Sequence, residues 1–213
     1  MTARRVAVAL PLPRRAQRFK WRETNGPAVP GADRGDRKTI MTEKNEGGMP
    51  GKQGEETLAI TRVFDAPREL VWKAWTDPER VKCWWGPEGF TSPEARTDPR
   101  PGGKYVYAMR SPEGQDFWST GVYRELVEPE RIVATDSFSD PQGNVIPASQ
   151  YGMAGDWPLE LTVTVTFEEV DGKTRLTLRH EGFPDRENRE MAGAGWNQSF
   201  DKLEDCLAKA KQS

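Results

Sequence analysis

Strict alternation of apolar and polar residues over two neighbouring segments constrains the fold of this chain most. From residue 159 to 167 the odd positions are apolar and the even positions polar. After a turn at Asp171-Gly172, the side chains of Leu176, Leu178 and His180 fall on one face, with polar residues between them. Such one-sided alternation predicts an antiparallel sheet with one face in water and the other face covered.

The cover is predicted at the C-terminal end of the chain. Between Arg186 and Lys209, four apolar residues follow one another at steps of four, three and four, as on one side of an amphipathic helix: Trp196, Phe200, Leu203 and Leu207. A sheet covered by one long helix is an α+β two-layer domain. If the sheet is strongly bent, space remains between it and the helix.

The first strand is followed by two short helices. Residues 58–64 have the pattern of a strand, which Asp65-Ala66-Pro67 ends. We expect Asp65 to cap the helix that follows, at residues 68–76. Asp77-Pro78 then begins a second short helix, at residues 79–84.

Further strands are predicted at residues 104–110, 117–125 and 131–138, with turn signals between them. A long loop without a predicted element runs from residue 139 to 155. Loops of this length in a small domain are often lids or binding loops.

Residues 1–56 show neither the helical nor the strand period, and they are rich in Gly, Pro and charge. This composition predicts a disordered basic leader, and the domain is expected at residues 57–210. Residues 1–40 hold ten Lys or Arg against three Asp or Glu, a balance of +7 in a chain whose total is −2. Met41 opens a plausible alternative start, so residues 1–40 are either an upstream extension or a basic arm for nucleic acid or anionic lipid. Secretion is less favoured, because the apolar run near the N-terminus is short and lacks a cleavage site.

The rest of the chain is acidic, which argues against nucleic acid as the partner of the domain. No apolar stretch is long enough to span a bilayer. The two cysteines, Cys83 and Cys206, are predicted to be unpaired thiols in a cytoplasmic protein, with a disulfide or a reactive thiol as the alternatives. No metal-binding spacing or cofactor fingerprint is present, so no metal and no cofactor are expected.

Aromatic residues supply candidate cavity walls. Trp84 and Trp85 are adjacent at a helix end and should point to different sides, so at most one of them is expected to line a cavity. Tyr105, Tyr107 and Met109 alternate onto one strand face, which is either the polar end of a pocket or a wet face.

His180 is the single histidine, and it alternates in phase with apolar residues. It is interpreted as a core residue, with ligand contact or general acid–base work as the alternatives. Glu181 should point to the opposite face. Asp98 and Asp116 fall near strand ends and are interpreted as solvated surface.

Five short motifs, in order, resemble one family: residues 62–67, 71–78, 84–87, 100–103 and 195–196. The family is that of the SRPBCC (START-like) proteins related to the C-terminal domain of the activator of heat-shock protein 90 ATPase. The resemblance implies a helix-grip fold (START/Bet v 1-like), with a curved antiparallel sheet wrapped around a long C-terminal helix and two short helices after the first strand. It also implies a hydrophobic ligand cavity.

The resemblance does not imply a reaction, because this fold hosts carriers, cyclases, hydratases and co-chaperones alike. The first hypothesis is a module that binds a small hydrophobic or amphipathic molecule, without catalytic residues. The alternatives are a co-chaperone-like or stress-related interaction protein, with a chaperone as partner, and a cyclase- or hydrolase-like enzyme. The predicted cavity residues are Trp85, Tyr105, Tyr107, Met109, His180 and Trp196.

Overall fold

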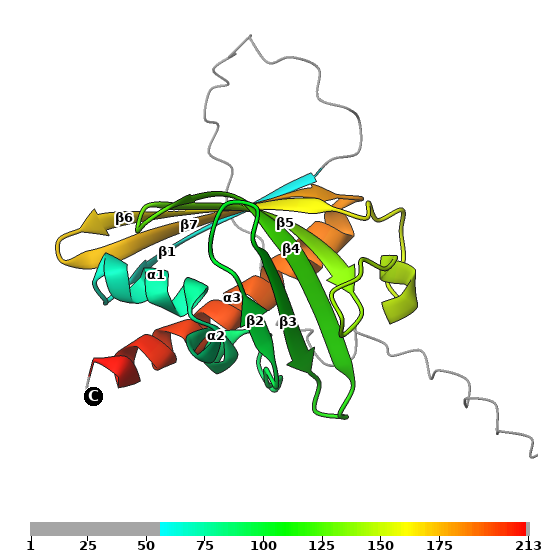
Figure 1. The fold of residues 1–213 in the computed structure, drawn as a ribbon, viewed down its shortest axis with the longest axis horizontal. Helices are drawn as coiled ribbons and strands as arrows, with labels where there is room; N and C mark the ends of the chain where they lie inside the picture. The colour runs from blue at the N-terminus through cyan, green and yellow to red at the C-terminus, as the bar shows by residue number, and fades with distance from the viewer. Residues whose placement is uncertain (1–55, 212–213) are drawn as a thin grey trace, which may run out of the picture. The chain divides into compact units, whose positions relative to one another are not determined.

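The computed structural model describes residues 56–211 (Figure 1). The expectations for the leader therefore lie outside the described residues, apart from Glu56, which is the first residue of a strand. Along the chain the elements are β1 (Glu56–Phe64), α1 (Arg68–Thr76), α2 (Pro78–Trp84), β2 (Ala95–Thr97), β3 (Lys104–Arg110), β4 (Asp116–Val127), β5 (Arg131–Ser139), the 3-10 helix η2 (Ala148–Tyr151), β6 (Leu161–Val170), β7 (Lys173–Phe183) and α3 (Arg186–Ala210).

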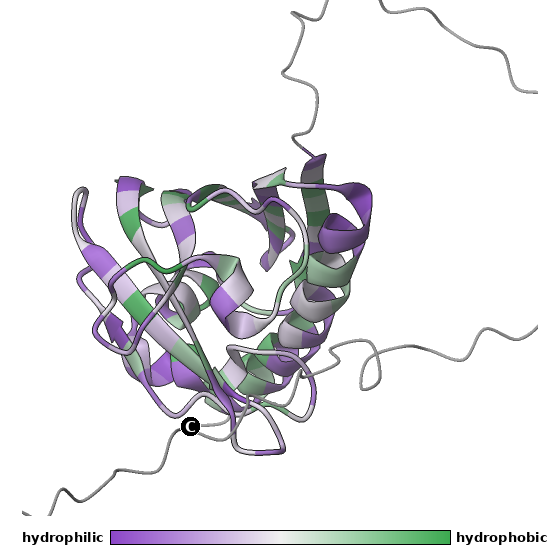
Figure 2. Ribbon diagram, turned by 90° about the vertical axis from the view of Figure 1, so that its right-hand side faces the viewer, coloured by the Kyte–Doolittle hydropathy of each residue, from purple (hydrophilic) through white to green (hydrophobic). Residues whose placement is uncertain are grey.

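The seven strands form one antiparallel sheet in the order β1-β7-β6-β5-β4-β3-β2. Every neighbouring pair except β1–β7 is also consecutive in the chain, so the first strand closes onto the last. α3 runs across one face of the sheet, and α1 and α2 lie beside it (Figure 1). A view turned by 90° shows that the sheet curves around the helical side (Figure 2). This is the helix-grip arrangement, and the predicted fold is confirmed.

The core forms where the alternating strands meet α3. Leu176 and Leu178 of β7 are fully buried, as are Phe200 and Leu203 of α3. The ring of Phe200 meets that of Phe64 edge to face, with the ring centroids 5.9 Å apart. The predicted apolar stripe of the helix therefore faces the covered side of the sheet, where burial of its apolar surface stabilises the domain.

Of the two predicted helix caps, the one at the start of α1 is wrong. Asp65 does not cap α1: the N-cap residue is Pro67, which makes no side-chain capping bond. Asp65 lies two residues too early to reach the first turn, and it instead pairs with Lys211 and Lys173. Lys211, then Lys173, lower the pKa of this carboxyl group. Asp77 does cap α2, accepting a hydrogen bond from the Glu79 amide at 2.9 Å.

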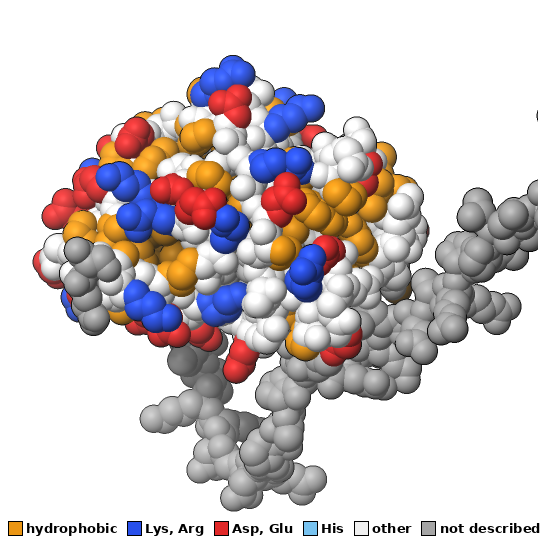
Figure 3. All heavy atoms as spheres, turned by 60° about the horizontal axis from the view of Figure 1, so that its bottom comes forward, with side chains coloured by type: hydrophobic (Ala, Val, Ile, Leu, Met, Phe, Trp, Pro, Cys, Tyr) orange, Lys and Arg blue, Asp and Glu red, His pale blue; other side chains and the backbone are white. Residues whose placement is uncertain are grey.

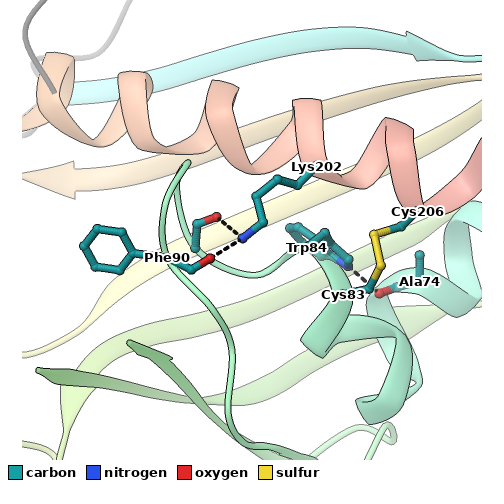
Figure 4. Close-up of a disulfide and its surroundings, with 7 residues drawn as sticks. Ala74, Cys83, Trp84, Phe90, Lys202 and Cys206 are labelled. Atoms are coloured by element: carbon teal, nitrogen blue, oxygen red, sulfur yellow. Dashed lines mark hydrogen bonds between the residues drawn. A yellow bond between two sulfur atoms is a disulfide. The ribbon is translucent and has the colours of Figure 1, made fainter. Parts of the chain in front are cut away.

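The two cysteines form a disulfide that joins α2 to α3, so the prediction of unpaired thiols is wrong (Figure 4). The Cα atoms of Cys83 and Cys206 lie 6.3 Å apart, although 123 residues separate them in the chain. This distance is within the range that a disulfide spans. The pairing could not be predicted from the sequence because α2 and α3 are brought together only by the tertiary fold. The expectation of a cytoplasmic location rested partly on unpaired thiols, and it stays a prediction.

Two polar contacts hold the same region (Figure 4). The indole nitrogen of buried Trp84 donates to the Ala74 carbonyl at 2.8 Å, which ties α2 to α1. The ammonium group of Lys202, on α3, donates to the carbonyls of Gly86 at 3.0 Å and Phe90 at 2.9 Å. The connection after α2 is thereby fastened to α3 at two points.

On the face shown in Figure 3, basic and acidic side chains are interspersed rather than gathered by sign. Across residues 56–211, no helix combines the length and apolar character that crossing a bilayer requires.

Candidate functional site

A small cavity lies between the sheet and the three helices. The space open to the centres of water molecules is about 40 Å³, which is room for roughly three waters. Its wall draws on α1, α2, α3 and strands β3 to β6, and is mostly aromatic or aliphatic: Trp75, Val81, Trp84, Trp85, Tyr105, Tyr107, Tyr123, Ile132, Ala134, Asp136, Val163, Val165 and Trp196.

Four of the six predicted cavity residues line this space: Trp85, Tyr105, Tyr107 and Trp196. Trp84 lines it as well, so the expectation that only one of the adjacent tryptophans could do so is wrong. The helix ends at Trp84, and Trp85 has extended backbone with φ −65° and ψ 127°. The two rings therefore do not point apart as they would within a helix, and they meet edge to face at 5.6 Å.

Met109 is not part of the wall. Its Cβ lies 3.1 Å from the position that a Cβ on Gly86 would occupy, so Met109 packs beneath the turn that follows α2. Gly86 has φ +97°, and this turn requires both its backbone freedom and its missing side chain. The turn thus covers the end of the strand face on which Met109 was expected to meet a ligand.

His180 is also absent from the wall, although it is buried and points to the covered side of the sheet. Trp196 lies between His180 and the cavity, and its indole nitrogen donates to His180 Nδ1 at 3.2 Å. An imidazole that accepts at Nδ1 carries its proton on Nε2 when it is neutral. Burial lowers the pKa of His180, and Asp136 only partly offsets this, so the ring is expected to be neutral near pH 7.

Three tyrosine hydroxyls gather at the end of the cavity near β3 and β4. The Tyr107 and Tyr123 hydroxyls are 3.2 Å apart, and Tyr123 reaches Thr97 Oγ1 at 2.8 Å. Burial raises the pKa of all three tyrosines, those of Tyr105 and Tyr107 most, so they remain neutral donors. The tyrosine face is therefore the polar end of a pocket and not a wet face.

The ring of Tyr105 lies directly against β4, where its partner in the register is Gly121. A Cβ at Gly121 would lie 2.5 Å from Tyr105 Cε1, so only glycine admits the ring there. In this position the Tyr105 hydroxyl oxygen lies 2.9 Å from both Asp136 Oδ1 and the Thr135 carbonyl oxygen, and these two acceptors share its one proton.

Asp136 is the one charged residue of the wall, and it was not among the predicted cavity residues. Its Oδ2 lies 3.4 Å from Nε2 of His180, which belongs to β7. A signal was present, because Asp136 continues the alternation of Ile132 and Ala134 on β5, both of which line the cavity. A carboxylate in phase with inward apolar residues is unusual and deserves the same weight as an inward histidine.

The other acidic candidates lie on the surface, as expected. Asp116 forms an exposed pair with Arg110, which lowers the pKa of that carboxyl group, and Asp98 pairs with Arg100. Among the residues described, no three His, Cys, Asp or Glu side chains gather as metal ligands.

The long loop between β5 and β6 packs on the far side of the Asp136–His180 pair. Tyr151, in η2, packs against Phe138, and Trp157 packs against Phe138 and Phe183. The ring of Phe183 lies 4.6 Å from that of His180. The loop therefore packs beside the ring that covers His180, and its role as a lid or binding loop stays a prediction.

Comparison with known proteins gives one family. A family model described as "Activator of Hsp90 ATPase homolog 1-like protein" matches residues 65–208. No curated protein sequence matches the chain.

Solved structures from several bacteria share the fold. A protein of Chromobacterium violaceum is 32% identical, with a TM-score of 0.58, and the match covers 71% of this chain and 96% of that one. A protein of Nitrosomonas europaea is 26% identical, with a TM-score of 0.60 and coverage of 74% and 97%. The AHSA1 protein of Silicibacter pomeroyi is 25% identical, with a TM-score of 0.59 and coverage of 73% and 99%.

Proposed function

This chain belongs to the family of activator of Hsp90 ATPase homolog 1-like proteins, and we propose that its domain binds a small hydrophobic or amphipathic molecule between the sheet and α3. The observation that carries the proposal is the cavity itself. Its wall combines aromatic and aliphatic side chains with a few polar groups at one end. This is the usual composition of a site for a small molecule.

The cavity of about 40 Å³ is smaller than most ligands, so binding requires the wall to open. Trp85 and Trp196 are the natural moving parts, because both are only half-buried while the rings behind them are buried. Trp85 follows the end of α2 rather than lying within it. A change in the side chains of these two residues enlarges the space without moving the sheet.

The proposal is tested with N-phenyl-1-naphthylamine, a neutral apolar fluorophore that brightens when it leaves water. We expect saturable binding to one site, with quenching of tryptophan fluorescence. Ala134→Leu fills the space from β5 and should weaken binding at least about tenfold, since the cavity loses the volume a guest needs.

Val133→Leu is the matched control. Val133 is the neighbour of Ala134 on β5 and points to the opposite face, so this change should leave binding intact. Thermal unfolding of both variants reports whether the fold is retained. The proposal fails if the native domain shows no saturable uptake, or if Ala134→Leu folds and binds as well as Val133→Leu does.

A further inference from the structure

The cavity wall carries a negative charge and no positive one. Among its thirteen lining residues, Asp136 is the only acidic side chain, and none is Lys or Arg. A carboxylate placed in an apolar wall is costly unless a cation or several hydrogen-bond donors satisfy it.

The partners of Asp136 within the domain leave this requirement incomplete. One oxygen, Oδ1, accepts from the Tyr105 hydroxyl at 2.9 Å. The other, Oδ2, faces His180 Nε2 at 3.4 Å, and Nε2 is buried without a hydrogen-bond partner. No other basic group pairs with this carboxylate in the described part of the chain.

The rings around the space form walls rather than one stack. Trp85 makes an interplanar angle of 63° with Tyr107 at 5.1 Å, and one of 85° with Trp196 at 5.6 Å. Trp75, which also lines the space, stacks on Trp196 at 5.9 Å and 14°. Rings set at such angles enclose a space from several sides, and the face of each ring attracts positive charge.

We infer that the ligand carries an ammonium group, and that Asp136 and the rings of Trp85, Tyr107 and Trp196 receive it. The ligand class is an amphipathic amine, protonated or quaternary, whose apolar part occupies the remainder of the cavity. The inference rests on the proposed function and names the chemistry of the molecule that fills the site. A cation next to Asp136 supplies the charge that the wall lacks, while the rings add their attraction.

His180 makes this recognition sensitive to pH. When its ring gains a proton, it becomes a cation beside Asp136 and competes with the ammonium group of the ligand. The acidic groups near the ring are Asp136 from β5 and Glu181 from its own strand. Its other neighbours are uncharged: Leu58 and Val163 pair with it across β1 and β6, and Trp196 and Phe183 pack on it. Ammonium binding should therefore weaken as pH falls.

The test compares phenyltrimethylammonium with tert-butylbenzene. The two have the same shape and differ in the positive charge, which does not change with pH. Titration followed by tryptophan fluorescence at pH 7.5 should show the cation binding at least about tenfold more tightly. As pH falls below 6.5, toward the lowered pKa of His180, the affinity for the cation should fall, while that for tert-butylbenzene stays constant.

Two variants and one control show which residues cause the preference for the cation and its pH dependence. Asp136→Asn keeps an acceptor for Tyr105 and should remove the preference for the cation while retaining tert-butylbenzene. Asp116→Asn, the same change at an exposed pair, should alter neither. His180→Gln should abolish the pH dependence.

The outcomes separate the inference from the proposed function. If tert-butylbenzene binds as tightly as the cation, or if the preference survives in Asp136→Asn, the ammonium inference is wrong and the cavity is still a ligand site. If neither compound binds and N-phenyl-1-naphthylamine also fails, the proposed function falls and takes the inference with it. Should Asp136→Asn not fold, the preference and its pH profile in the native protein decide the matter.

Discussion

His180 is buried, neutral and the single histidine of the chain, so its titration can be followed without interference from others. Burial lowers its pKa in the folded state below the ordinary value of 6.5. The unfolded chain therefore binds more protons once pH falls below about 6.5, and the free energy of unfolding should decline with pH in that window.

Urea unfolding at pH 7.5, 6.5 and 5.5 measures this decline, which approaches about 1.4 kcal/mol for each pH unit between 6.5 and the lowered pKa of the folded state. His180→Gln should show a flatter profile over the same range. Equal slopes for the two proteins would mean that the histidine titrates normally and is not desolvated.

Lys202 illustrates a polar contact that holds two elements together. Its two hydrogen bonds to the carbonyls of Gly86 and Phe90 fasten the turn after α2 to α3. Lys202→Met keeps most of the apolar stem and removes both bonds, so we expect a loss of about 1–3 kcal/mol in the free energy of unfolding. Lys82→Met, which breaks an exposed pair with Glu79, should cost about 0–1 kcal/mol. If urea unfolding gives equal costs for both, the turn is not held by Lys202.

At the residue scale, sequence reasoning found the ring walls and missed the charges. The sequence was sufficient to predict Trp85, Tyr107 and Trp196 as wall residues, because large aromatic side chains stand out and fall in phase with the apolar residues of their elements. Asp136 was overlooked because a carboxylate on a strand is usually solvated, and its pairing with His180 spans β5 and β7, which have β6 between them. Met109 was misplaced because nothing in its own strand reveals that the turn at Gly86 covers it.

The apolar stripe of α3 contains residues of two kinds. Phe200 is fully buried and packs on Phe64, Trp75 and Trp196. Phe200→Ala should cost about 3–5 kcal/mol, as expected for a large core side chain. Trp196 is half-buried at the cavity, so Trp196→Ala should cost less, about 1–3 kcal/mol, by the apolar area it covers. Chemical denaturation of the two variants measures which substitution lowers the free energy of unfolding more. A greater loss for Trp196→Ala would show that Trp196, and not Phe200, anchors the helix.

The elements that the sequence predicted are those with strong periodicity. β6, β7 and α3 were anticipated within a few residues, because alternation and the helical stripe are long enough to be unambiguous. β2 was missed, since its three residues carry no pattern and it exists only by pairing with β3. The cap at Asp65 failed for a similar reason: its lysine partners lie more than 100 residues away.

At the scale of the whole molecule, the disulfide shortens the unfolded chain by closing a loop of 123 residues. By loop-closure entropy, its reduction should lower the free energy of unfolding by about 2–5 kcal/mol. Cys83 is exposed, so a thiol reductant can reach the bond. Urea unfolding with and without dithiothreitol measures the difference, and Cys83→Ser with Cys206→Ser should match the reduced protein. An unchanged midpoint under reduction, together with two titratable thiols in the native protein, would show that the bond does not form.

The pairing of β1 with β7 sets the order in which this domain can assemble. Each strand from β3 to β7 can pair with its predecessor as soon as it is made, but β1 has to wait for a partner more than 100 residues away. α3 contacts β1 through the buried rings of Phe200 and Phe64 and through the ion pair between Asp201 and Arg62. Contacts so distant in sequence slow folding, and during synthesis the first strand keeps an unpaired edge until the last one emerges. The nascent chain is therefore most exposed to misassociation just before its C-terminal third is complete.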